Sequence, residues 1–117
     1  MEGLNRLYNQ ARDRIGLMAA RYTLEREYSG NGLHSWRIPR DIGAGFMLGL
    51  VLPWSPPDND SLGLGEVERK LIEQAHEKIG VITGKVAQRF GLEPLISPPI
   101  FSAKGGYTVL VGLKKAS

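Results

Sequence analysis

The chain contains no cysteine and only two histidines among its 117 residues. Without cysteine there can be no disulfide bond and no thiolate metal site, and this composition fits a reducing compartment. His34 and His76 are too few to build a histidine metal site without carboxylate ligands. We therefore expect neither a bound metal nor a cofactor.

Long apolar runs and dense clusters of one charge are also missing. The longest apolar stretch, residues 42–54, is shorter than the about 20 residues that a membrane-spanning helix needs. Residues 1–14 lack the basic start and apolar stretch of a secretory signal, so we expect a cytoplasmic protein. The net charge of +3 is spread along the chain, which leaves a nucleic-acid partner open without indicating one.

Motifs that carry enzymatic chemistry are absent from the sequence. There is no phosphate-binding P-loop, no Gly-x-Ser-x-Gly nucleophile elbow and no His-Glu-x-x-His zinc motif. We therefore expect a non-enzymatic protein.

What the sequence does contain is an internal repeat. The segment "LYNQARDRIGLMAARY" (7–22) aligns with "LIEQAHEKIGVITGKV" (71–86) at an offset of 64, with five of sixteen positions identical. Farther along, "AGFMLGLVL" (44–52) aligns with "GGYTVLVGL" (105–113) at an offset of 61. We predict a single domain built from two copies, about 1–54 and 62–117, joined by the linker 55–61.

Each copy begins with a segment whose apolar residues recur at steps of three and four, which is typical of one face of a helix. In the first copy this face consists of Leu4, Leu7, Tyr8, Ala11, Ile15, Met18 and Tyr22. In the second it consists of Val67, Leu71, Ala75, Ile79, Ile82, Val86 and Phe90. Gly91 is suited to end the second helix, and Pro94 prevents its resumption.

Two strands are expected after each helix. Residues 46–54 and 107–114 have the composition of strands, whereas 34–42 and 95–103 contain prolines that suit edge strands or bulges. The order αββαββ predicts an α+β fold, a two-layer sandwich of two helices on a four-stranded, mainly antiparallel sheet. Moving the first strand of the ferredoxin-like order βαββαβ to the end produces the same sequence of elements, so we expect a permuted ferredoxin-like arrangement.

Small residues occupy matching positions in the two helices. Glycine inside a helix costs about 1 kcal/mol relative to alanine, yet Gly16 and Gly80 align with each other. With Ala20 and Gly84 they would form a patch of small residues, which we interpret as a site of close helix–helix packing. A kink or a tolerated glycine is the alternative interpretation.

The strand "GFMLGLVLPW" (45–54) is apolar on both of its faces. Its even-numbered residues can meet the helices, and the opposite face would then carry Met47, Val51 and Pro53, joined by Leu110 from the second copy. An apolar patch on the uncovered face of a two-layer fold indicates a partner surface. We therefore predict an assembly or adaptor subunit that self-associates, with a twofold homodimer as the default, or that binds another protein.

Two alternatives rest on polar and basic residues. A small ligand could bind, or be acted on, at the 30–40 loop, where His34, Trp36, Arg37 and Arg40 stand close together, although a Trp36 packed into the core explains this segment without a ligand. Nucleic acid could bind a basic face that adds Lys104, Lys114 and Lys115 to these residues.

Overall fold

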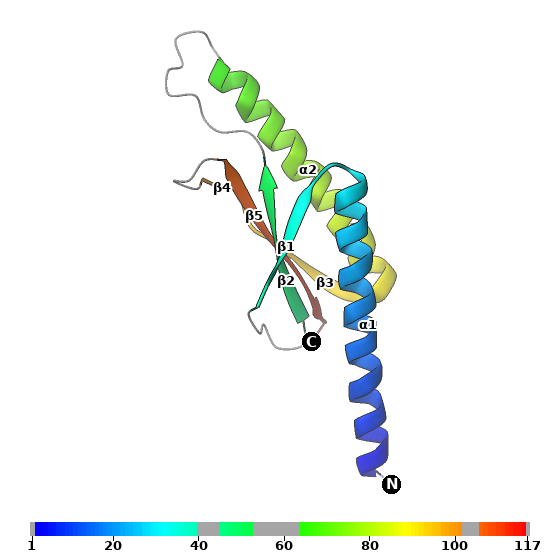
Figure 1. Cartoon of the computed structure of the whole chain (residues 1–117). Helices are drawn as coiled ribbons and strands as arrows, with labels where there is room; N and C mark the ends of the chain where they lie inside the picture. Colours follow the sequence, from blue (N-terminus) through cyan, green and yellow to red (C-terminus); the bar gives the residue numbers. More distant parts are fainter. Residues whose placement is uncertain (1, 40–44, 53–63, 102–105, 117) are drawn as a thin grey trace.

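The structure of the protein is a computed structural model, which describes residues 2–39, 45–52, 64–101 and 106–116 (Figure 1). The linker 55–61 and the candidate residues Arg40, Pro53 and Lys104 lie outside the described residues.

Helices and strands follow one another in an α+β order, as predicted. The elements are α1 (Glu2–Gly30), β1 (His34–Ile38), β2 (Gly45–Leu52), α2 (Leu64–Phe90), β3 (Leu92–Ile96), β4 (Ile100–Phe101) and β5 (Tyr107–Lys115). Gly91 follows α2 with a positive φ of 66°, a conformation that glycine adopts without strain, so the predicted end of this helix is confirmed.

The described strands form one open antiparallel sheet in the order β1-β2-β5-β3, with β4 also paired to β5. β3 and β4 run along the same edge of β5 as two pieces of one interrupted strand. Pro98 and Pro99 interrupt it because proline has no backbone N–H to donate. Ser97 bridges the break, since its backbone N donates to the Leu110 carbonyl and its Oγ accepts from the Leu110 N, both at 2.8 Å. The sheet consequently has five strands where four were predicted.

Both helices cover one face of this sheet. The side chains that β2 and β5 turn toward the helices are buried, namely Phe46, Leu48, Leu50, Leu52, Val109, Val111 and Leu113. They pack in one cluster with apolar residues of α1 and α2, including Leu24 and Ile79. The strand alternation predicted for residues 46–52 is therefore confirmed.

A buried hydrogen bond joins the two helices within this cluster. Thr83 Oγ1 donates to the Ile79 carbonyl at 2.6 Å, so the Tyr28 hydroxyl is the donor in its bond to Thr83 Oγ1. Both residues are fully buried. Burial raises the pKa of Tyr28 well above its ordinary value, and the bond to Thr83 lowers it by less.

The face of α2 predicted from periodicity is the buried one along most of the helix, but the predicted face of α1 is not. Ile15 is 68% exposed, whereas its aligned partner Ile79 is fully buried. The expectation that both residues face the sheet is wrong, because α1 packs instead through Ala20, Leu24 and Tyr28, which lie on its other side. The first half of α1 extends beyond the sheet (Figure 1).

The interpretation of the aligned glycines also needs correction. A Cβ atom built on Gly16 or Gly84 would meet no atom of a neighbouring element within 4 Å, and one on Gly80 would reach only the Ile96 side chain at 4.0 Å. The two helices therefore do not require glycine at these positions. Ala20 is fully buried, so it is the member of the predicted patch that does lie in the core.

The molecule is long and narrow, with extents of 70 × 24 × 23 Å. Its radius of gyration is 17.2 Å, against about 13 Å for a compact chain of this length. The N-terminal halves of α1 and α2 point away from the sheet at opposite ends (Figure 1). None of the described helices is long and apolar enough to cross a membrane.

Candidate interaction surface: the open face of the sheet

The register of the strands defines the face that the helices leave uncovered. Residues directly opposite each other in an antiparallel pair lie on the same side of the sheet. Gly49 pairs with Trp36 on one side and with Leu110 on the other, and these three alternate with the buried residues of β2 and β5. The same rule places Met47 and Val51 on this side. We call this uncovered side the open face.

Trp36 projects from the edge strand β1 across the open face toward β2. Its indole ring covers Gly49, and a Cβ atom added to Gly49 would overlap the ring. The side chain is nevertheless 39% exposed. The expectation that Trp36 packs into the core is therefore wrong, because the register of β1 turns position 36 away from the helices.

Apolar residues of the other strands share the open face with Trp36. Val51 is 39% exposed, and Met47 and Leu110 are half-buried. The register adds further members that were not predicted, namely Ile38 on β1, Leu95 on β3 and Ile100 on β4. The alternation in residues 46–52 predicted that Met47 and Val51 lie on this face. The positions of Ile38, Leu95 and Ile100 depend on how the strands pair, which the local sequence does not determine.

The cluster predicted at residues 34–40 is divided between the two sides of the sheet. His34 pairs with Val51 and Trp36 with Gly49, so both lie on the open face. Arg37 lies on the helix side, where its guanidinium contacts the Glu25 carboxylate of α1 at 3.2 Å and 3.4 Å. Arg37 is therefore paired with an acid and does not join His34 and Trp36 in one ligand site.

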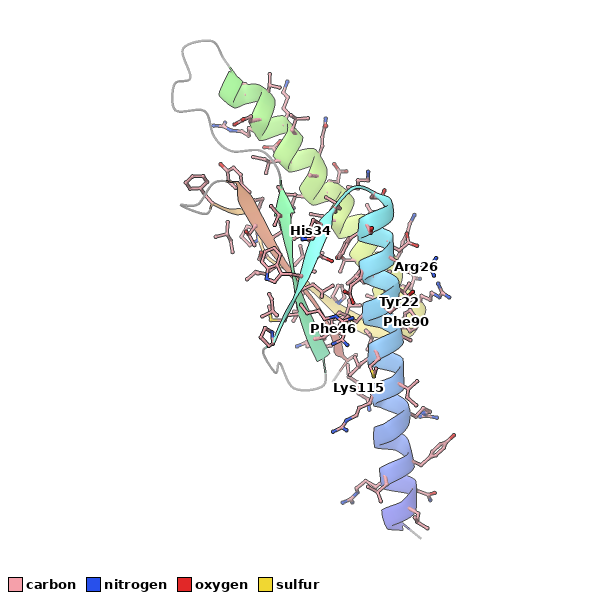
Figure 2. The ribbon with its side chains drawn as sticks, in the orientation of Figure 1. Tyr22, Arg26, His34, Phe46, Phe90 and Lys115 are labelled. Carbon is pink, nitrogen blue, oxygen red and sulfur yellow. The ribbon has the colours of Figure 1, made fainter. Side chains whose placement is uncertain are left out.

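The other predicted basic residues that the structure describes are also dispersed. Lys114 pairs with Gly45 at one end of β2, whereas His34 pairs with Val51 near the other end. Figure 2 likewise places His34 and Lys115 toward opposite ends of the sheet. Lys114 also stands opposite Glu93 of β3, an acid. These residues do not form a continuous basic surface.

A groove lies between the two helices, away from the open face. This groove of about 420 Å³ has apolar walls at Val81 and Ile82 and charged residues at Glu27, Lys85 and Arg89. Neither His34 nor Trp36 lines it. Within the described ranges, no three side chains of the His, Asp and Glu types gather as a metal site would require.

The remaining histidine has a structural contact. His76 on α2 is half-buried, and its Nε2 lies 2.8 Å from the carbonyl oxygen of Ser97, the residue that bridges β3 and β4. This hydrogen bond connects α2 to the interrupted edge of the sheet.

Comparison of the chain with protein-family models, with curated proteins and with solved structures finds no match.

Proposed function

We propose that the chain is a non-enzymatic assembly subunit that associates through the open face of its sheet, with a second copy of itself as the partner. The observation that carries this proposal is an aromatic side chain, Trp36, which is half-exposed on the open face and lies over Gly49, beside the apolar residues of β2 and β5. Tryptophan is enriched at the centres of protein interfaces, where a partner buries it.

The size of the open face suits a weak twofold dimer. β2 is eight residues long. At about 3.3 Å per residue and about 4.8 Å between strands, four neighbouring strands present about 500 Å², so two copies would bury about 1,000 Å². That area is near the lower limit of specific interfaces, so we expect association at micromolar rather than nanomolar concentrations.

Flat sheet faces also pair with each other readily, at a separation of about 10 Å. The two strands at the centre of the open face, β2 and β5, are the longest in the sheet. We therefore favour a second open face over a helix or a loop as the occupant.

We further propose that the chain arose by duplication of an αββ unit. The strand registers support an offset of 61 between the copies. Phe46 and Leu52 correspond to Tyr107 and Leu113 at this offset, and the pairs Phe46–Leu113 and Leu52–Tyr107 are therefore equivalent. The pair His34–Val51 likewise corresponds to the pair Leu95–Gly112. The strand order β1-β2-β5-β3 is also the one that a permuted ferredoxin-like sheet would have. In the helices, an offset of 62 aligns core-facing residues with core-facing residues, namely Leu17, Ala20, Leu24 and Tyr28 of α1 with Ile79, Ile82, Val86 and Phe90 of α2.

Charge substitutions on the open face test the association. Val51→Glu or Leu110→Glu places a carboxylate in the proposed interface, where its desolvation opposes binding. We expect the wild-type chain to form a dimer whose mass by light scattering depends on concentration, and both variants to remain monomers.

Val81→Glu is the matched control, since Val81 is an exposed valine on α2 and lies away from the open face. We expect this variant to dimerise like the wild type. A dimer that persists in both open-face variants, or a wild-type chain that stays monomeric at high concentration, would contradict self-association through this face.

A further inference from the structure

Helix α1 has a second apolar face that the fold does not use. Residues two apart in a helix are separated by about 200°, so they lie on opposite sides. Leu17, Ala20 and Leu24 pack against the core. Ile15, Met18 and Tyr22, each two positions earlier, are all more than 60% exposed and therefore face away from it.

This exposed face continues along the part of α1 that extends beyond the sheet (Figure 1). Leu4 and Tyr8 belong to it and are as exposed as Ile15. Together with position 11, they produce the spacing 4, 8, 11, 15, 18, 22, which alternates steps of four and three. We call the exposed residues Leu4, Tyr8, Ile15, Met18 and Tyr22 the α1 stripe.

The spacing of the α1 stripe identifies the kind of surface that it fits. Alternating steps of four and three keep apolar residues on a single seam when two helices supercoil, and they correspond to the a and d positions of a heptad. Such a narrow seam matches a second helix lying nearly parallel to α1. Over Leu4 to Tyr22 the seam is about 27 Å long at about 1.5 Å per residue.

The seam has a defined end. The next heptad position after Tyr22 is occupied by Glu25, whose carboxylate contacts Arg37 at 3.2 Å and Arg21 at 3.9 Å. Arg26 lies with its guanidinium 5.8 Å from the centre of the Tyr22 ring, beside the last residue of the seam (Figure 2). The partner helix is therefore expected to reach no farther than this charged group.

Charges beside the α1 stripe identify the partner's chemistry. The heptad positions that flank a and d, called e and g, hold Arg12 and Arg26 on one side and Arg14 and Arg21 on the other. Across a coiled coil these positions face those of the partner helix. A second α1 would place arginine against arginine, so it is a poor occupant. The exposed apolar residues of α2, Val67 and Val81, are too far apart to form a matching seam.

We propose that the α1 stripe binds an acidic amphipathic helix of another protein, one with apolar residues at heptad spacing and glutamate or aspartate at its flanking positions. This binding uses the side of α1 opposite the sheet and is independent of association through the open face.

The test uses the full chain and two synthetic helical peptides of four heptads, both with leucine at the a and d positions. One peptide carries glutamate at its e and g positions and the other carries lysine. By fluorescence anisotropy at low salt, we expect the glutamate peptide to bind at least about tenfold more tightly than the lysine peptide. Added salt should reduce this preference.

Substitutions then locate the site. Ile15→Glu should weaken binding of the glutamate peptide by about tenfold or more, while Val81→Glu and Leu110→Glu should leave it unchanged. The double change Arg12→Glu with Arg14→Glu should reverse the preference between the two peptides. Because Ile15 is exposed, the variant should keep the wild-type melting temperature by circular dichroism.

Several results would overturn the proposal. Equal affinity for both peptides, or full binding by Ile15→Glu, would show that the α1 stripe is not the site. Dimerisation through α1, seen as self-association lost in Ile15→Glu, would show that its occupant is a second copy. Sedimentation of the chain with phosphatidylserine vesicles but not with the glutamate peptide would identify a lipid surface instead.

Discussion

Tyr28 and Thr83 join the two helices by a hydrogen bond that neither residue can replace with water, because both are fully buried. Thr83 uses its own hydrogen to bond the Ile79 carbonyl, so it can only accept from Tyr28. The sequence repeat did not indicate this contact, since Thr83 aligns with Ala19 at an offset of 64 and Tyr28 lies beyond the aligned segment 7–22.

Removing the two partners singly and together tests this bond. Tyr28→Phe should cost about 1 kcal/mol of unfolding free energy, and Thr83→Val about 1–3 kcal/mol, because the second change leaves the Tyr28 hydroxyl buried without an acceptor. The double variant should lose less than the sum of the two. Urea denaturation measures all three values, and strictly additive losses would mean that the hydroxyls do not interact.

The raised pKa of Tyr28 predicts a loss of stability in alkali. In the unfolded chain tyrosine loses its proton near its ordinary pKa of about 10, whereas burial keeps folded Tyr28 protonated. The unfolded state then binds fewer protons, so unfolding free energy falls as pH rises above about 10, by up to about 1.4 kcal/mol per pH unit.

The free energy that protonated Tyr28 contributes to stability is fully present below about pH 10, and the Tyr28→Phe variant lacks it at every pH. The difference in unfolding free energy between wild type and variant, measured by urea denaturation, should therefore shrink between about pH 9 and pH 11. A difference that stays constant over this range would show that Tyr28 ionises as easily in the folded state as in the unfolded one.

Among the elements, α1 and α2 show what periodicity can and cannot predict. α2 has one apolar face, and Ala75, Ile79 and Ile82 are buried as expected. α1 has two apolar faces, and the longer one, which includes Ile15 and Met18, is the one that the fold leaves exposed. Hydrophobic spacing identifies an apolar face of a helix, but it does not indicate whether the fold of the same chain covers that face.

Strands were predicted more successfully than their registers. Prolines at positions 98 and 99 indicated an edge strand or a bulge, and β3 and β4 form that interrupted edge. The position of Trp36 depended on the register between β1 and β2, which the turn between them decides. A shift by one residue would have turned Trp36 toward the helices and Arg37 toward the open face.

Glycine-to-alanine substitutions in a helix and in a strand should have opposite effects on the unfolding free energy. Gly84→Ala should raise the unfolding free energy by about 0.5–1 kcal/mol, because alanine is the better helix former and its Cβ would meet no neighbouring element within 4 Å. Gly49→Ala should lower it by about 1–3 kcal/mol, because its Cβ would overlap the Trp36 ring. Thermal denaturation followed by circular dichroism compares the two variants.

The control for this pair is the background Trp36→Ala, in which Gly49→Ala should become nearly neutral. Destabilisation by Gly84→Ala would show that the glycine is required for packing after all. An equal cost of Gly49→Ala with and without the tryptophan would show that the ring does not lie over this position.

At the scale of the whole molecule, the two helices cover one sheet face and leave the other open, with apolar residues such as Val51 and Leu110 on it, while the N-terminal ends of the helices project beyond the sheet. A chain of this length could bury more of its surface in a rounder shape, as the radius of gyration shows. Both the open face and the α1 stripe are therefore surfaces at which association would complete the burial that folding leaves unfinished.

Cross-linking through a single introduced cysteine is the most direct measurement of the central proposal, because the natural sequence has none to interfere. We expect Leu110→Cys, at the centre of the open face, to yield covalent dimers with a short bifunctional maleimide at concentrations where the chain associates, and Val81→Cys to yield none. Dimers from position 81 but not from position 110, or none from either, would contradict pairing through the open face.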